Sequence, residues 1–329
     1  MQRAPTWITH RRFIGLRNDY LLAIGILCVA FIIAACGIGG AYFSSVTAAF
    51  LFYSVVTLGW CLLAGYGGMF SLAPSATVMI SAYVSAIVGN SGLPIALAIL
   101  LGTIAGALTG LIVALSTSRL KGHYFALSTL VAAEIVRLII TNEYELTGGE
   151  AGLRTGPLFP GASGADMSLI LIGALVTLLT GLLFALRGTP GLIIQAIRDD
   201  DEIASIRGIN VPALKIFIVV TGSSIMAFAG AVYVHYIQLA TPEMGSLFQT
   251  TFILAIGIIG GIRSMSGPVV GAAIIITLQE ALREYPFIHM GLTALGILVV
   301  CQFAPAGVAG WLLNGLERLR GIRTKESSV

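Results

Sequence analysis

Residues 44–64 read SSVTAAFLFYSVVTLGWCLLA, a run without a charged side chain. A helix needs about 20 apolar residues to cross the hydrocarbon core of a bilayer, so this run is long enough to span it. Comparable runs recur along the chain and predict an all-α fold, a polytopic transmembrane helical bundle of about ten spans with broken helices. The predicted segments are 20–42, 44–64, 69–89, 94–116, 123–141, 168–186, 216–238, 247–260, 267–282 and 288–304.

The composition excludes most water-soluble proteins. Of the 329 residues, 57% are hydrophobic and 10% are charged, whereas a soluble domain carries about 25% charged residues. The short stretches between the apolar runs leave no room for a soluble enzymatic domain. The four cysteines lie within apolar runs and show no pairing pattern, which favours packing roles for Cys28, Cys36, Cys61 and Cys301.

The distribution of basic residues predicts the orientation of the chain. With a cytoplasmic N-terminus and alternating spans, all 18 Lys and Arg except Arg137, Arg154 and Arg283 lie inside. This bias follows the positive-inside rule and makes both termini cytoplasmic. The resulting division is a cytoplasmic tail at 1–19, a transmembrane domain at 20–305 that contains an external loop at 142–167 and a cytoplasmic loop at 187–215, and a cytoplasmic tail at 306–329.

Two of the predicted segments, 247–260 and 267–282, are shorter than a full span. They are either tilted or are half-helices that enter the bilayer without crossing it.

The loop 187–215 carries helix start and stop signals, which predict one broken helix or two short ones. Thr189 followed by Pro190 is a start, and Asp199 with Glu202 three residues later is a possible capping box. The stop is supplied by Gly208 and Asn210, and the apolar face by Ile193, Ile197, Ile203 and Ile206.

Four consecutive acids at 199–202 indicate what this loop contacts. A short amphipathic helix can lie along the lipid headgroups. An anionic inner leaflet would repel the acids, however, whereas a basic groove on a soluble partner would attract them. We therefore favour a soluble partner.

Two glycine-rich breaks interrupt the apolar segments, one from Gly65 towards Thr77 and one from Gly257 to Pro268. Backbone that leaves helical pairing inside a bilayer must be packed in protein or line water, and broken segments in two halves of a chain point to a translocation path. Close helix packing is the alternative. The candidate path residues are Gly65, Tyr66, Gly67, Gly68, Ser71, Ser75, Gly260 and Gly261.

Other small or charged residues favour structural roles. Gly102, Gly106 and Gly110 fall at every fourth position, which favours close helix packing. Glu134 and Arg137 lie one turn apart, which favours a local salt bridge, although ionisable groups inside spans are also commonly functional. We expect His235 to be interfacial and structural.

Several short motifs occur together in an order that resembles one family. They are GYGG at 65–68, RLKG at 119–122, TGGEAG at 147–152, AIRDDDEIA at 196–204, GIN at 208–210, TPE at 241–243 and IGG at 259–261. Over most of residues 60–285, they are similar to the LivM-type permease subunits of branched-chain amino-acid ABC importers.

This resemblance implies a noncatalytic permease subunit that moves branched-chain amino acids or similar small polar solutes across a bacterial inner membrane. The implied partners are a related permease in a heterodimer, two cytoplasmic ABC ATPase subunits that bind ATP and Mg²⁺, and a periplasmic or other extracytoplasmic solute-binding protein. The chain itself would bind no cofactor and no metal. The implied ATPase-coupling residues are Arg198, Asp199, Asp200, Asp201, Glu202 and Gly208, and the implied docking residues for the binding protein are Thr147, Gly148, Gly149 and Gly152.

Alternative functions stay open at this stage. An ABC permease for urea or amides would look similar. An ion-coupled secondary transporter or channel needs acids inside the membrane, and Glu134 is the candidate. The sequence has no Gly-Lys dipeptide and therefore no phosphate-binding P-loop, its four His are scattered, and we expect no nucleic-acid partner.

Overall fold

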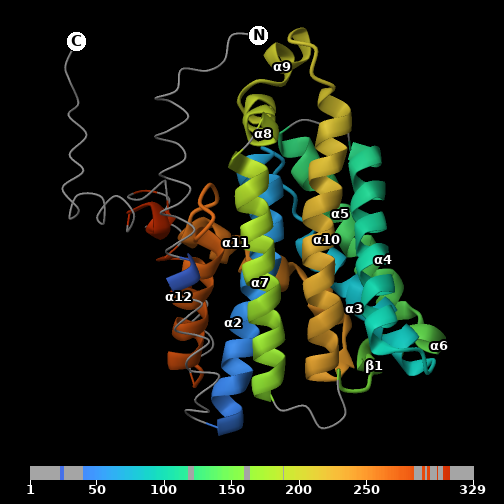
Figure 1. The fold of residues 1–329 in the computed structure, drawn as a ribbon. Helices are drawn as coiled ribbons and strands as arrows, with labels where there is room; N and C mark the ends of the chain where they lie inside the picture. The colour runs from blue at the N-terminus through green and yellow to red at the C-terminus, as the bar shows by residue number, and fades with distance from the viewer. Residues whose placement is uncertain are drawn as a thin grey trace.

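The computed structural model describes residues 23–25, 40–117, 122–158, 164–187, 189–284, 291–292, 295–296, 302 and 307–311. Within these residues, long helices run side by side in a bundle (Figure 1). The elements are α2 (Gly40–Cys61), π-helix η1 (Leu62–Tyr66), α3 (Pro74–Asn90), α4 (Ile95–Thr117), α5 (His123–Asn142), α6 (Tyr144–Thr147), 3₁₀-helix η2 (Gly149–Ala151), β1 (Leu153–Arg154), α7 (Gly164–Arg187), α8 (Thr189–Asp199), α9 (Asp201–Ile206), α10 (Val211–Ile237), β2 (Leu239–Ala240), 3₁₀-helix η3 (Pro242–Gly245), α11 (Leu247–Gly260) and α12 (Gly267–Ala281).

The predicted all-α, multi-pass fold is confirmed. Every predicted segment from 44–64 to 267–282 corresponds to a helix, whereas 20–42 and 288–304 lie largely outside the described residues. Four described helices are long and apolar enough to cross a bilayer. The segment predicted at 69–89 was wrong at its start, because the chain stays non-helical until Pro74 opens α3.

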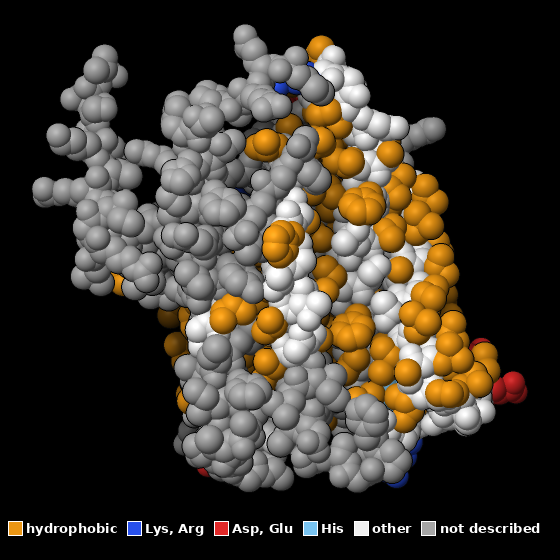
Figure 2. Space-filling view, in the orientation of Figure 1, with side chains coloured by type: hydrophobic (Ala, Val, Ile, Leu, Met, Phe, Trp, Pro, Cys, Tyr) orange, Lys and Arg blue, Asp and Glu red, His pale blue; other side chains and the backbone are white. Residues whose placement is uncertain are grey.

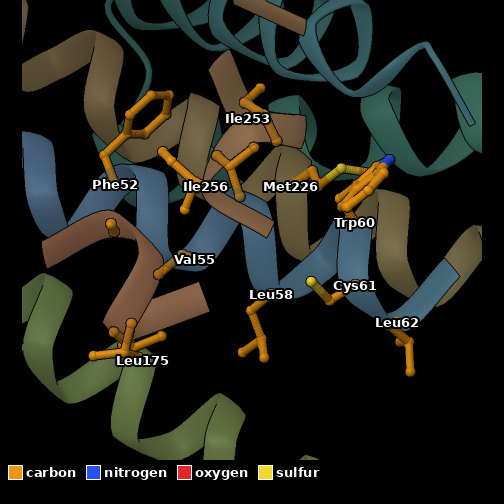
Figure 3. Close-up of a cluster of buried hydrophobic side chains, with 14 of the residues drawn as sticks. Phe52, Val55, Leu58, Trp60, Cys61, Leu62, Leu175, Met226, Ile253 and Ile256 are labelled. Atoms are coloured by element: carbon orange, nitrogen blue, oxygen red, sulfur yellow. The ribbon is translucent and has the colours of Figure 1, made fainter. Parts of the chain in front are cut away.

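Helix α2 lies at the centre of the packing, where it contacts α7, α10, α11 and α12. Figure 3 shows Leu58 and Trp60 of α2 in one cluster with Leu175 of α7, Met226 of α10 and Ile256 of α11, with Met226 next to Trp60. In lipid the hydrophobic effect does not drive helices together, so this interdigitation stabilises the bundle through van der Waals contacts. Trp60 and Leu58 are fully buried.

Helix α4 has two different faces. Large apolar side chains on its outer face, including Leu100, Ile104 and Leu108, are exposed, and this side of the molecule in Figure 2 is covered by hydrophobic side chains. On its inner face, a Cβ atom on Gly106 would lie 2.3 Å from the Cβ of Ala227 in α10. The predicted packing role of the glycine stripe is therefore confirmed, and the outer face is suited to lipid.

Helix α11 begins inside the bundle. At the start of α3, Ser75 Oγ lies 3.2 Å from the carbonyl oxygen of Gly245 and 2.5 Å from Thr250 Oγ1. The 14 residues of α11 extend about 21 Å, less than the ~30 Å hydrocarbon core. These two facts favour the half-helix interpretation of 247–260 over a tilted full span.

The end of the bundle that carries α6 and β1 is tightly held. Strand β1 pairs antiparallel with β2, a pairing that the sequence analysis did not predict. His235 Nδ1 lies 3.0 Å from the carbonyl oxygen of Gly156, and His235 Nε2 lies 2.9 Å from Ser85 Oγ. A carbonyl only accepts, so Nδ1 carries the proton. His235 is 1% exposed, which supports its predicted structural role, and its position relative to the membrane interface stays a prediction.

The α4–α10 contact predicts an asymmetric response to glycine substitution. Gly106→Ala should lower the free energy of unfolding by about 1–3 kcal/mol, because its Cβ would overpack against Ala227. Gly173→Ala in α7 is the matched control, since a Cβ there meets nothing within 4 Å and alanine favours a helix. Thermal unfolding in detergent measures both. Equal midpoints for the two variants would contradict the close packing.

Candidate functional site

The acidic loop, residues 187–215, folds into two short helices, α8 and α9, as one of the two predicted arrangements. Asp200 is the N-cap of α9, and its Oδ1 accepts hydrogen bonds from the backbone N–H of Glu202 at 2.8 Å and of Ile203 at 3.0 Å. The predicted cap at Asp199 was therefore wrong by one residue. Asp199 ends α8, and its side chain lies outside the described part of the structure.

The stop signals act separately. Gly208 has φ of +82° and follows the C-cap of α9, so it ends that helix as predicted. Asn210 instead begins α10, because its Oδ1 accepts from the N–H of Ala213 at 3.2 Å. One Gly-Ile-Asn segment thus ends one helix and starts the next, which fixes how α9 meets α10.

The apolar face of the acidic loop is split between two directions. Ile197 is buried with Ala204 and Val211, where it holds α8, α9 and α10 together. In contrast, Ile203 is 50% exposed and Ile206 is 81% exposed. The single apolar face predicted for these isoleucines was wrong, and α9 presents its two isoleucines outward.

Arg198 joins this loop to the break between α2 and α3. Its Nη1 donates to the carbonyl oxygen of Gly65 at 3.2 Å. Gly68 has φ of +71°, and a Cβ on it would lie 2.8 Å from Arg198 Cγ, so the backbone approaches the arginine stem as only glycine allows. Two segments that the sequence analysis treated as separate sites are therefore in contact.

Other side chains form hydrogen bonds with further backbone groups of the break. Trp60 Nε1 donates to the carbonyl oxygen of Ser71 at 2.8 Å, and the N–H of Leu72 donates to Thr129 Oγ1 at 2.9 Å. Backbone groups without helical partners are costly in a membrane unless protein supplies them. Side chains of α2, α5 and the acidic loop therefore hold the break in a defined conformation.

A cavity of about 640 Å³ lies where the break, the acidic loop and the starts of α5 and α10 meet. Gly67 and Gly68 line it from the break, and the acids Asp200, Asp201 and Glu202 line it from the loop. Lys215 of α10 also lines it and forms an ion pair with Asp201. The sequence analysis did not assign Lys215 to the site; a lone lysine at the start of an apolar span was the available signal.

The remaining candidate path residues are packed. A Cβ on Gly65 would lie 1.9 Å from the carbonyl oxygen of Ile262, so the two predicted breaks contact each other. Gly260 and Gly261 pack closely on Gly267 and Gly307. Tyr66, Ser71 and Ser75 are buried, and only Gly67 and Gly68 of the predicted path residues line the cavity.

The candidate docking turn, Thr147–Gly152, lies at the other end of the bundle from α9 (Figure 1). Thr147 Oγ1 donates to the carbonyl oxygen of Ile140 at 2.7 Å. Gly148, Gly149 and Gly152 all have positive φ, and a Cβ on Gly152 would lie 2.2 Å from the carbonyl oxygen of Ala240. The turn is thus rigidly shaped.

The two charged residues of α5, Glu134 and Arg137, are paired with each other. Arg137 donates from Nε to Glu134 Oε2 at 3.0 Å and from Nη2 to Oε1 at 2.5 Å, which confirms the predicted salt bridge. Among the residues that the structure describes, no cluster of His, Cys, Asp and Glu could hold a metal ion.

The contact between Arg198 and Gly65 can transmit movement between the acidic loop and the membrane helices.

Comparison with known proteins finds one matching family model and several relatives. A sequence model described as "Branched-chain amino acid transport system / permease component" matches residues 42–302. The high-affinity branched-chain amino acid transport system permease protein LivM of Salmonella typhimurium is 25% identical over 289 residues, covering 77% of this chain and 65% of that protein. The probable branched-chain amino acid transport permease protein LivM of Methanocaldococcus jannaschii is 27% identical over 196 residues, covering 58% of this chain and 57% of that protein.

A third relative is the high-affinity branched-chain amino acid transport system permease protein LivH of Salmonella typhimurium. It is 23% identical over 286 residues, covering 78% of this chain and 91% of that protein. The chain spans less than two thirds of the length of the LivM relatives. No solved structure matches it.

The Asp200 cap predicts a local loss of helix stability on substitution. Asp200→Ala removes the acceptor for two backbone N–H groups, which costs about 1 kcal/mol. Amide hydrogen exchange in α9 should accelerate about fivefold, measured by mass spectrometry. Glu202→Ala is the control, and Asp200→Asn should retain the cap. Equal protection of α9 in the Ala and Asn variants would contradict the capping assignment.

Proposed function

The chain belongs to the family of permease components of branched-chain amino acid transport systems, and we propose that it is the translocating membrane subunit of an ATP-driven importer for these amino acids. On this proposal it lies in a bacterial inner membrane with both termini in the cytoplasm. It pairs with a related permease and receives solute from an extracytoplasmic binding protein.

The observation that carries the proposal is the hydrogen bond from Arg198 to Gly65. The acidic loop presents carboxylates and two outward isoleucines, Ile203 and Ile206. A soluble ATPase with a basic, partly apolar groove is complementary to this surface. When such a partner moves α9, Arg198 transmits the displacement to the break that connects α2 and α3.

ATP hydrolysis would then occur on two partner subunits. The acidic loop contributes no phosphate-binding glycine loop, and the chain needs no bound cofactor for this role, since ATP and Mg²⁺ are bound by the ATPases. Of the acids at 199–202, Asp200 and Glu202 are exposed and would face their groove, while Lys215 holds Asp201 against α10.

The opposite end of the bundle would receive the binding protein. The Thr147–Gly152 turn is held in one shape by its glycine conformations and by the β1–β2 pairing. Next to it, Tyr144 is 70% exposed and Leu146 is 64% exposed. A rigid turn with outward apolar side chains supports protein docking, because little conformational freedom is lost on binding.

An ion-coupled carrier is less well supported. It requires a membrane acid that exchanges a proton or a sodium ion. Glu134 is near the middle of α5, and Arg137 holds both of its carboxylate oxygens. Both carboxylate oxygens are thus already engaged within the protein, which leaves this acid poorly placed to bind a transported ion.

The coupling role is tested by Arg198→Ala in the complete importer reconstituted with its ATPases and binding protein. Loss of a hydrogen bond from a charged group corresponds to about a tenfold effect, so ATP-driven leucine uptake should fall about tenfold while ATP hydrolysis continues. Arg207→Ala is the matched control, because Arg207 lies in the same loop, is exposed and follows α9. Equal uptake by the two variants would contradict the proposal.

A further inference from the structure

A charged notch opens on the side of the bundle, away from both docking ends. The cavity, about 530 Å³, lies between the middle of α5 and the start of α11. Its charged residues are Glu134, Arg137 and Glu243. Small-molecule sites occupy about 300–1,000 Å³, so the notch is large enough for an amino acid.

The charged residues of the notch need polar or protein neighbours inside a membrane. Glu134 and Arg137 lie near the middle of a 20-residue apolar helix, and their side chains are 43% and 27% exposed. Charged groups at this depth face a bundle interior or a water-filled cavity. Like α4, α5 also carries exposed apolar side chains, among them Leu127, Val131 and Ile135, so the charged notch interrupts an otherwise apolar face.

We propose that this notch binds the zwitterionic amino acid within the membrane, with Arg137 and the N-terminus of α11 on its carboxylate, Glu243 on its ammonium group, and apolar residues around its side chain. The inference rests on the proposed function and adds the place and chemistry of recognition.

The donors for a carboxylate converge from two elements. Glu134 engages Nε and Nη2 of Arg137 and leaves the N–H groups of Nη1 unused by this pair. Helix α11 starts at the same place, and the positive end of a helix that begins inside the membrane favours an anionic group. Glu134 is thus a positioning residue that orients the guanidinium.

The ammonium and the side chain have their own partners. Glu243 is exposed and lines the same notch, so its carboxylate can accept from an ammonium group across it. Leu130, Leu247 and Phe248 form the apolar wall. A branched aliphatic amino acid has these three features, namely an anion, a cation and an apolar group.

Cysteine accessibility tests whether the notch is wet and occupied. In the complete importer, with the four native cysteines replaced, Leu247→Cys should react with a membrane-impermeant, water-soluble thiol reagent, and saturating leucine should slow the reaction. Leu108→Cys is the control, because Leu108 and Leu247 are 52% and 55% exposed but Leu108 lies on the apolar face of α4. It should not react.

Leucine uptake tests whether the charged residues of the notch take part in transport. Arg137→Gln should lower leucine uptake about tenfold, the effect of one lost charge-assisted hydrogen bond, and Arg137→Lys should restore part of it. Glu280→Gln is the control, since Glu280 at the end of α12 forms an ion pair of the same spacing with Arg283, which follows the helix. It should retain uptake.

The outcomes separate this inference from the proposed function. If the importer takes up leucine but Leu247→Cys is unreactive, or is not protected by leucine, the notch is not the binding place and the transport role stands. If the wild-type complex takes up no branched-chain amino acid, the proposed function fails and the notch assignment fails with it. If Arg137→Gln does not insert, the accessibility result alone decides.

Discussion

Backbone groups that leave helical pairing inside a bilayer need partners within the protein, and the break after α2 meets this constraint with side chains from distant segments. The carbonyl of Gly65 accepts from Arg198, that of Ser71 accepts from Trp60, and the N–H of Leu72 donates to Thr129. The same bonds that make the break tolerable also tie it to the acidic loop and to α5. The hydrogen bonds that satisfy the backbone of the break are therefore also the contacts that connect it to its neighbours.

On the proposed function, this constraint would let a short loop act on long helices. Helix α2 is central and buried, and it contacts α7, α10, α11 and α12. Close-packed interiors transmit displacement, because side chains cannot shift independently of their neighbours. The second break reaches the first through Ile262, so a movement of Arg198 would be felt in α11 and α12 as well.

The helices could be predicted from the sequence because lipid imposes apolar runs of a fixed length, and the glycine stripe of α4 could be predicted because small residues recur at one face. The contact between Arg198 and Gly65 could not be predicted, since 133 residues separate them. Nothing in the sequence indicates which residue of the loop meets which residue of a span. Asp199 and Asp200 are equally good caps by type, and geometry chose the second. Ile197 lies in α8 and Ile203 and Ile206 lie in α9, and six residues are too few for periodicity to show which side of α9 faces outward.

The central claim is that α9 and the break move as one body during the ATP cycle. Spin labels at Ser205 in α9 and at Phe70 in the break measure it directly in the complete importer. Two further pairs join Leu93, between α3 and α4, to Ser205 and to Phe70. From the nucleotide-free to the ATP-bound state, the account predicts an unchanged Ser205–Phe70 distance and a changed Ser205–Leu93 distance. A changed Ser205–Phe70 distance with an unchanged Phe70–Leu93 distance would show that the loop moves alone, and would contradict the account.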